Sequence, residues 1–272
     1  MRRMSLVASV RKAAWLLWVF VLIAPAGCAA PTTPETKTSP TPVPTSIAEP
    51  APAPPREQVI ELPGGVLVDR LGREVRVPAE VAIDVGWLEQ IACSRGTREH
   101  ESLLVVDVPP SEIHAALMLI GLKPGRPGAW IFEESETGTP RVKRIAPKGD
   151  SVEVRVAYQD SEGSSHDRPI AAWIIGSDGE ETFPSMPWVF GGSTFRTHTS
   201  AEGTTETYVA DESGSLVGLV TFGDEVLGLD IVISDQIAVD AAEWEVNTAV
   251  IPTPGTSVQM ILRPWPVAGE DK

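Results

Sequence analysis

The chain has 272 residues, a formal net charge of −15 at pH 7 and two cysteines, Cys28 and Cys93. An acidic chain repels phosphate backbones, which argues against nucleic-acid binding. Two cysteines are too few for an iron–sulfur cluster or a cysteine-rich zinc site, which need about four. The length fits one large domain or two small ones, and we expect no metal or other cofactor.

The first 28 residues have the layout of a bacterial export signal. Two clusters of positive charge, Arg2-Arg3 and Arg11-Lys12, precede a short apolar run over residues 13–27. This run is shorter than the about 20 residues that a membrane span needs. It ends in Pro25-Ala26-Gly27-Cys28, which resembles the lipobox, in which the cysteine becomes the lipidated first residue. Pro25 departs from the preferred aliphatic residue, and an uncleaved anchor or ordinary cleavage nearby are the alternatives.

Residues 29–56 are rich in Pro, Thr and Ala and are expected to form a disordered tether. Nine of these 28 residues are proline, which fixes φ and removes a backbone donor, so neither a helix nor a sheet can form. An extended, partly polyproline II spacer would hold a folded domain away from a membrane. We therefore expect a protein of the cell envelope, attached to the membrane through an N-terminal lipid or anchor, with its domain outside the cytoplasm.

From residue 57 onward, alternating apolar and polar residues predict a single β-rich domain over residues 57–264, followed by a tail at 265–272. The clearest strand covers residues 152–159, where Val152, Val154 and Val156 share one face. A turn at 160–163 and a return strand at 168–175 should follow. Further short strands are expected near 66–69, 74–77, 102–108, 206–210, 216–221 and 257–262.

One helix is expected over about residues 111–121. Ser111 can cap its N-terminus, and Gly121 can end it. Its apolar stripe consists of Ile113, Ala116, Leu117 and Ile120. Because the flanks of this stripe are apolar too, we expect the helix to be buried on most sides. The predicted fold class is α+β, mostly β, with antiparallel or mixed sheets packed around this helix. A weaker helix near 235–245 and an irregular surface excursion over 128–149 are also expected.

The stretch ACSRGTREHESLLVVDVPPSEIHAALMLIGLKPG at residues 92–125 resembles the YdjY-domain family of bacterial proteins. Other matching blocks are ELPGGVLVD at 61–69, WVFGGSTF at 188–195, YVAD at 208–211 and NTAVIPTPGTSVQMILRP at 247–264. The resemblance covers roughly residues 57–264 and implies no chemistry, because the family has no established activity. Some members are described as ferredoxin-like because they carry extra cysteine clusters, which this chain lacks.

The best candidates for chemistry are Cys93, Glu99, His100, Glu101 and His114. A Cys–His pair can form a thiolate nucleophile, with a carboxylate such as Glu101 orienting the imidazole. Alternatively, His100 and His114 could converge on a metal with a carboxylate. Against both, Cys93 lies in the apolar stretch LEQIAC, where a free cysteine usually packs, and His114 borders the apolar face of the expected helix.

Three hypotheses of function follow. The first is a non-catalytic, envelope-tethered binding or scaffold module for an unknown envelope protein or ligand, which the tether and the lack of a strong catalytic motif favour. The second is a Cys/His- or metal-dependent hydrolase centred on Cys93, His100 and His114. The third, an accessory to envelope redox chemistry, rests only on the ferredoxin-like members of the family. Ser193 in GGSTF lacks the G-x-S-x-G spacing of a nucleophile, and Gly191-Gly192 are expected to form a turn.

Overall fold

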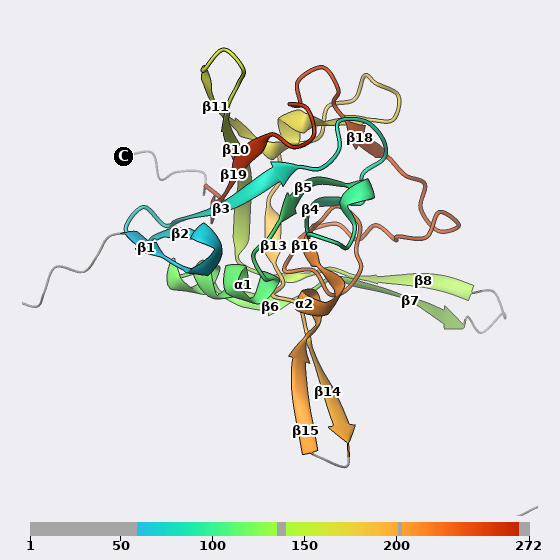
Figure 1. Cartoon of the computed structure of the whole chain (residues 1–272). Helices are drawn as coiled ribbons and strands as arrows, with labels where there is room; N and C mark the ends of the chain where they lie inside the picture. The colour runs from blue at the N-terminus through green and yellow to red at the C-terminus, as the bar shows by residue number, and fades with distance from the viewer. Residues whose placement is uncertain (1–58, 135–139, 201–202, 267–272) are drawn as a thin grey trace, which may run out of the picture. The chain divides into compact units, whose positions relative to one another are not determined.

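The structure, a computed structural model, describes residues 59–134, 140–200 and 203–266, and strands dominate it (Figure 1). The first nine strands are β1 (Val59–Glu61), β2 (Leu67–Asp69), β3 (Glu74–Val81), β4 (Gln90–Ser94), β5 (Ser102–Val106), β6 (Pro124–Arg126), β7 (Ala129–Glu134), β8 (Pro140–Ile145) and β9 (Lys148–Gly149). The next ten are β10 (Ser151–Gln159), β11 (Ser165–Pro169), β12 (Ile174–Gly176), β13 (Trp188–Phe190), β14 (Phe195–Ser200), β15 (Gly203–Tyr208), β16 (Ser215–Gly218), β17 (Leu227–Leu229), β18 (Trp244–Val246) and β19 (Ser257–Pro264). The helices are α1 (Pro110–Leu119) and α2 (Val209–Ser213), with 3-10 turns at Pro63–Gly65, Glu99–Glu101 and Ile170–Trp173.

Eight strands close into a barrel in the order β3-β19-β10-β13-β17-β16-β4-β5. The ring is completed where β5 pairs with β3, through Glu80 opposite Val105 and Val81 opposite Leu104. Pairing is parallel between β16 and β17 and between β4 and β5, and antiparallel elsewhere in the ring. Closure stabilises such a sheet because each strand of the ring has a neighbour on both sides.

The core follows directly from the alternation in the sequence. Residues of one face of β10, β19 and β3 lie opposite one another and form rows across the three strands. The rows are Val156–Met260–Val77 and Val154–Leu262–Val75. All six side chains are at most 1% exposed, so each row removes apolar area from water at about 25 cal/mol per Å².

The prediction of a mostly β domain is confirmed, but two of its local details are corrected. The strand expected at 152–159 is β10, and the turn at 160–163 joins it to β11, but that return strand ends at Pro169 and not at 175. The excursion expected over 128–149 contains instead the hairpin β7–β8, whose tip at 135–139 lies outside the described residues. Figure 1 shows this hairpin and the hairpin β14–β15 extending away from the barrel.

The prediction of a weaker helix near 235–245 is wrong. This segment is an irregular loop that ends in β18. Ile237 is 85% exposed, so this apolar side chain of the loop packs against no other surface. A short helix without a packed face is not stable in water, because its nucleation is unfavourable.

Helix α1 begins and ends close to the prediction, and its apolar stripe is buried as expected. Its other side is not buried, since Met118 and Leu119 are 52% and 41% exposed. The strands close on one another and α1 packs through one face only, which corrects the expected arrangement of sheets around a helix buried on most sides. Its N-terminus lacks the expected side-chain cap from Ser111; the Asp211 carboxylate of α2 accepts the Ser111 backbone N–H at 2.8 Å instead.

Several expectations concern residues outside the described part of the chain. These are the export signal at 1–28 with Cys28, the tether at 29–56 and most of the tail at 265–272. Within residues 59–134, 140–200 and 203–266, no helix has the length and apolar character needed to cross a membrane.

Candidate functional site

Cys93 lies on β4 with 0% exposure, between Val105 of β5 and Ser215 of β16. Burial raises the pKa of its thiol, and hydrogen bonding to Ser102 and Thr97 only partly opposes this. A neutral, buried thiol is a poor nucleophile, because the thiolate is the reactive form.

His100 and Glu101 lie in the 3-10 turn that precedes β5. His100 Nε2 lies 3.5 Å from Glu101 Oε2, and the His100 side chain is 78% exposed. The main influences on the pKa of Cys93 include the predicted residue Glu99 but neither His100 nor Glu101. Among the residues that the structure describes, no group of three or more His, Cys, Asp or Glu is placed to hold a metal ion.

His114 lies on α1 and faces Tyr208 and Gly192. The Tyr208 hydroxyl donates to the Gly192 carbonyl at 2.9 Å, and its oxygen is 2.8 Å from His114 Nδ1. Because the hydroxyl has a single proton, His114 Nδ1 must carry the hydrogen and donate it to Tyr208. Burial lowers the pKa of His114, which keeps the ring neutral at pH 7. His114 is therefore a hydrogen-bonded structural residue in this arrangement, and the catalytic role of the predicted cluster stays a prediction.

The turn expected at Gly191-Gly192 is not present; after β13 the chain continues beside Val226 and Glu225, whose carbonyl groups accept the Gly192 and Ser193 N–H groups. Gly192 has φ of 83°, and a Cβ there would lie 2.7 Å from the Cβ of Pro124 and 3.0 Å from His114 Cε1. Ser193 follows with φ of 55°, and its Oγ donates to the Asp224 carbonyl and accepts the Ala210 N–H. The one donor of this hydroxyl and one of its acceptor positions are thus used to fix the loop.

The state of Cys93 can be tested by alkylation. We expect iodoacetamide to modify the Cys93 peptide of the folded full-length chain roughly 100-fold more slowly than in denaturant, since the thiol is buried and neutral. Peptide mass spectrometry measures this, and Thr199→Cys on the exposed strand β14 supplies a rapidly labelled control. Rapid labelling of Cys93 in the folded chain would instead support the hydrolase hypothesis.

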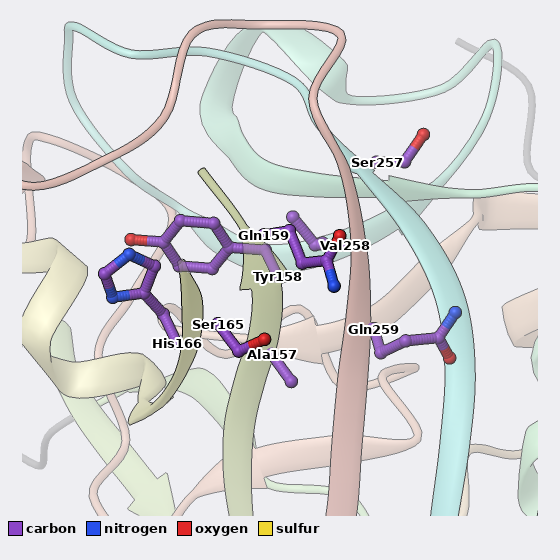
Figure 2. Close-up of a pocket in the computed structure, with 8 residues that line it drawn as sticks. All are labelled: Ala157, Tyr158, Gln159, Ser165, His166, Ser257, Val258 and Gln259. Atoms are coloured by element: carbon purple, nitrogen blue, oxygen red, sulfur yellow. The ribbon is translucent and has the colours of Figure 1, made fainter. Parts of the chain in front are cut away.

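One hollow of about 400 Å³ lies over β10, β11 and β19 (Figure 2). Tyr158 and His166 stack there with ring centroids 4.8 Å apart, and His166 Nε2 is 2.7 Å from Asp160 Oδ2. This contact and the N–H groups of Ser164 and Glu162 lower the pKa of Asp160. The imidazole and the carboxylate are thus engaged in holding the hairpin turn.

A second cavity, of about 460 Å³, has a more apolar lining and is the better candidate for a binding site. Its apolar and aromatic walls include Trp87, Leu88, Val220, Ile233, Ile237 and Trp244. Its acidic side chains are Glu89, Asp235, Asp240 and Glu243. The volume falls within the roughly 300–1,000 Å³ of small-molecule sites, which are mostly apolar with a few placed polar groups.

Backbone bonds place the two tryptophans of this cavity. Gly86, with φ of 116°, allows the chain to turn so that Trp87 forms an isolated antiparallel β-bridge with Glu245 of β18. Leu88 N–H donates to the Trp244 carbonyl, and Val246 N–H donates to the Gly86 carbonyl, both at 3.0 Å. Trp244 is 9% exposed, whereas Trp87 is 48% exposed at the rim.

The loop that forms the opposite wall is fixed by one ion pair. Arg144 of β8 donates to both carboxylate oxygens of Asp240, at 2.6 and 2.8 Å, and to the Val232 carbonyl at 3.0 Å. Asp240 also accepts the Ser234 N–H at 2.7 Å. The guanidinium lowers the pKa of Asp240, which is therefore an occupied, charged tie between the hairpin β7–β8 and the loop.

Glu89 connects this cavity with the predicted residue Glu101. Burial raises the pKa of Glu89, and the charges of Glu101 and Asp235 raise it further. Arg98 opposes the shift, with Nη1 3.6 Å from Glu101 Oε1 and its guanidinium 3.8 Å from the centroid of the Phe222 ring. Raised pKa values of this kind concentrate at functional sites.

Sequence reasoning found Glu101 but missed this cavity. The residues around Trp87 and those around Trp244 are far apart in the chain, and no local spacing relates them. The one feature that the two segments share in the sequence is a tryptophan close to acidic residues. This combination is too common at protein surfaces to identify a binding site.

The fold and this cavity define a β-rich barrel domain with an acidic, tryptophan-lined site. A family model described as YdjY domain matches residues 66–263, which confirms the resemblance seen in the sequence, and the chain belongs to this family. No curated protein and no solved structure shows a significant match to the chain.

Proposed function

We propose that this protein is a non-catalytic binding module of the cell envelope, and that its ligand enters the cavity beside Trp87 and Trp244. The observation that carries the proposal is the cavity itself, which combines apolar walls with the carboxyl group of Glu89. The residues that line it in the described part of the chain include no cysteine or histidine. Binding, and not bond cleavage, is the function that such a lining supports best.

The N-terminal sequence supports the envelope location. A lipid on Cys28, or an uncleaved anchor in residues 13–27, would attach the chain to the membrane, and the tether at 29–56 would let the domain reach a ligand or an envelope protein. Mass spectrometry of the mature protein should find a lipid-modified Cys28 as the first residue. Full-length protein that retains Met1 and is recovered from the cytosol would contradict this location.

Replacing Trp87 tests the binding proposal. We expect Trp87→Ala to weaken the binding of small apolar fragments by about tenfold or more, because a partly exposed tryptophan at the rim is the largest contact that such a cavity offers. Ligand-observed NMR on the full-length chain measures the affinities. Trp265→Ala, which removes a tryptophan outside the lining, is the matched control and should leave them unchanged. Equal affinities for the Trp87→Ala variant and the unmodified protein would refute the site.

A further inference from the structure

The cavity holds more negative charge than its surroundings neutralise. Of its four acidic side chains, Asp240 is paired with Arg144, whereas Glu89 takes part in no ion pair within the described residues and is repelled by a second carboxyl group, that of Glu101. Asp235 and Glu243 take part in no ion pair within the described part of the chain. Arg98 also attracts Glu89, but its guanidinium is shared with Glu101 and lies over the ring of Phe222.

The carboxyl pair is held in place by the backbone. Glu89 N–H donates to the Glu101 carbonyl at 3.0 Å, and the Glu89 carbonyl accepts the N–H groups of Leu219 and Val220 at 2.9 and 3.0 Å. These bonds fix the origin of both side chains before any ligand arrives. Two carboxyl groups fixed at close range repel each other once both are ionised, and a cation between or beside them removes that repulsion.

From the apolar walls together with the unpaired acidic side chains of Glu89, Asp235 and Glu243 in the same lining, we infer that the ligand of the cavity is an amphiphilic organic cation. An ammonium group on an apolar stem matches both parts of the lining. The stem packs against Leu88, Ile233 and the tryptophans, and the head lies at Glu89 with Asp235 nearby. The tryptophan rings add a cation–π attraction where the head approaches a ring face. The inference rests on the proposed function and specifies the charge of the ligand.

The test compares three probes of equal chain length on the full-length protein. These are n-hexylammonium, n-hexanol and hexanoate, titrated by calorimetry at pH 7 and low salt. We expect hexylammonium to bind at least about tenfold more tightly than hexanol, and hexanoate to bind least, because only the head-group charge differs among them. The preference for hexylammonium should fall as salt is added.

Glu89→Gln isolates the contribution of the carboxyl pair. This variant keeps the shape of the side chain and should lower the affinity for hexylammonium about tenfold while leaving that for hexanol unchanged. Glu206→Gln, on the exposed strand β15, removes one equal charge elsewhere and is the matched control. Thermal unfolding of both variants verifies that they are folded.

The outcomes separate the two proposals. If hexanol binds as tightly as hexylammonium and Trp87→Ala weakens both, the inferred charge is wrong and the binding site stands. If no probe binds, or if Trp87→Ala changes nothing, the proposed function itself fails. If the Glu89→Gln and Glu206→Gln variants lose equal affinity for hexylammonium, overall charge attracts the cation and the inferred role of Glu89 is overturned.

A small amphiphilic amine and the lysine side chain of a protein both carry an ammonium group on an apolar stem. An acetylated and amidated Gly-Lys-Gly peptide, titrated alongside hexylammonium, distinguishes the two sources. Binding of the peptide at least as tight as that of hexylammonium assigns the site to a lysine of a protein partner. Binding of hexylammonium alone assigns it to a small amphiphilic amine.

Discussion

Glu225→Gln is expected to stabilise the protein at pH 8 by about 3 kcal/mol and to have little effect below pH 4.5. Glu225 is 1% exposed, and burial raises the pKa of its carboxyl group from 4.5 to about 7. The N–H groups of Gly223 and Asp224 donate to its Oε2 at 2.8 and 3.1 Å and offset only part of the shift, and the neighbouring Asp224 carboxylate raises the pKa further.

The sign follows from the protonated form being favoured in the folded state. The stabilising contribution of the protonated carboxyl is complete below the unfolded pKa near 4.5 and is lost as the pH rises through the folded pKa near 7. Glutamine keeps the acceptor for the two N–H groups and cannot ionise, so it avoids that loss. Urea unfolding of variant and unmodified protein between pH 4.5 and 8 measures the difference, with Glu206→Gln on β15 as the exposed control. A difference that does not grow between pH 5 and 8 would show that Glu225 is not destabilised by burial.

Leu104→Ala is expected to lower the free energy of unfolding by about 3 kcal/mol, within the range of 2–5 kcal/mol for a buried leucine. Leu104 is 0% exposed on β5, where it lies opposite Ala92 of β4 and Val81 of β3. The pairing of β5 with β3 has only two residue pairs, so this side chain supports the junction that closes the ring. The cost combines lost transfer free energy with the cavity that a closed barrel cannot collapse.

The matched control for this prediction is Leu119→Ala on α1. It makes the same chemical change at a side chain that is 41% exposed, and we expect a loss below about 1 kcal/mol. Denaturant midpoints of the two variants give the comparison. Equal losses would mean that the junction of β3 and β5 contributes no more than a surface position.

Local alternation was enough to predict β10, because its buried and exposed residues alternate over the whole strand. It could not predict that β5 pairs with β3, since this closing contact joins strands whose register depends on the complete ring. The helix α1 was predicted from its apolar stripe, but the exposure of Met118 depends on what covers the other side. The helix predicted at 235–245 does not form because the apolar residues of this loop line a cavity rim and do not pack as a helix face.

The same distinction applies to the site. Cys93, His100 and His114 suggested a cluster because they are close in sequence, but a strand, a surface turn and a helix give them different surroundings. The cavity forms from segments near both ends of the domain, and its carboxyl pair depends on a backbone contact between Glu89 and Glu101. Only Glu101 belongs to both the predicted cluster and the surroundings of the cavity.

The position of β19 has a consequence for how the domain is made. This strand is the last one in the described part of the chain, yet it lies between β3 and β10, which precede it. A nascent polypeptide that stops before Ser257 leaves both of those strands with an unpaired flank. The ring can therefore close only after synthesis has passed Pro264, and until then the growing chain lacks the contacts that join its early and middle strands.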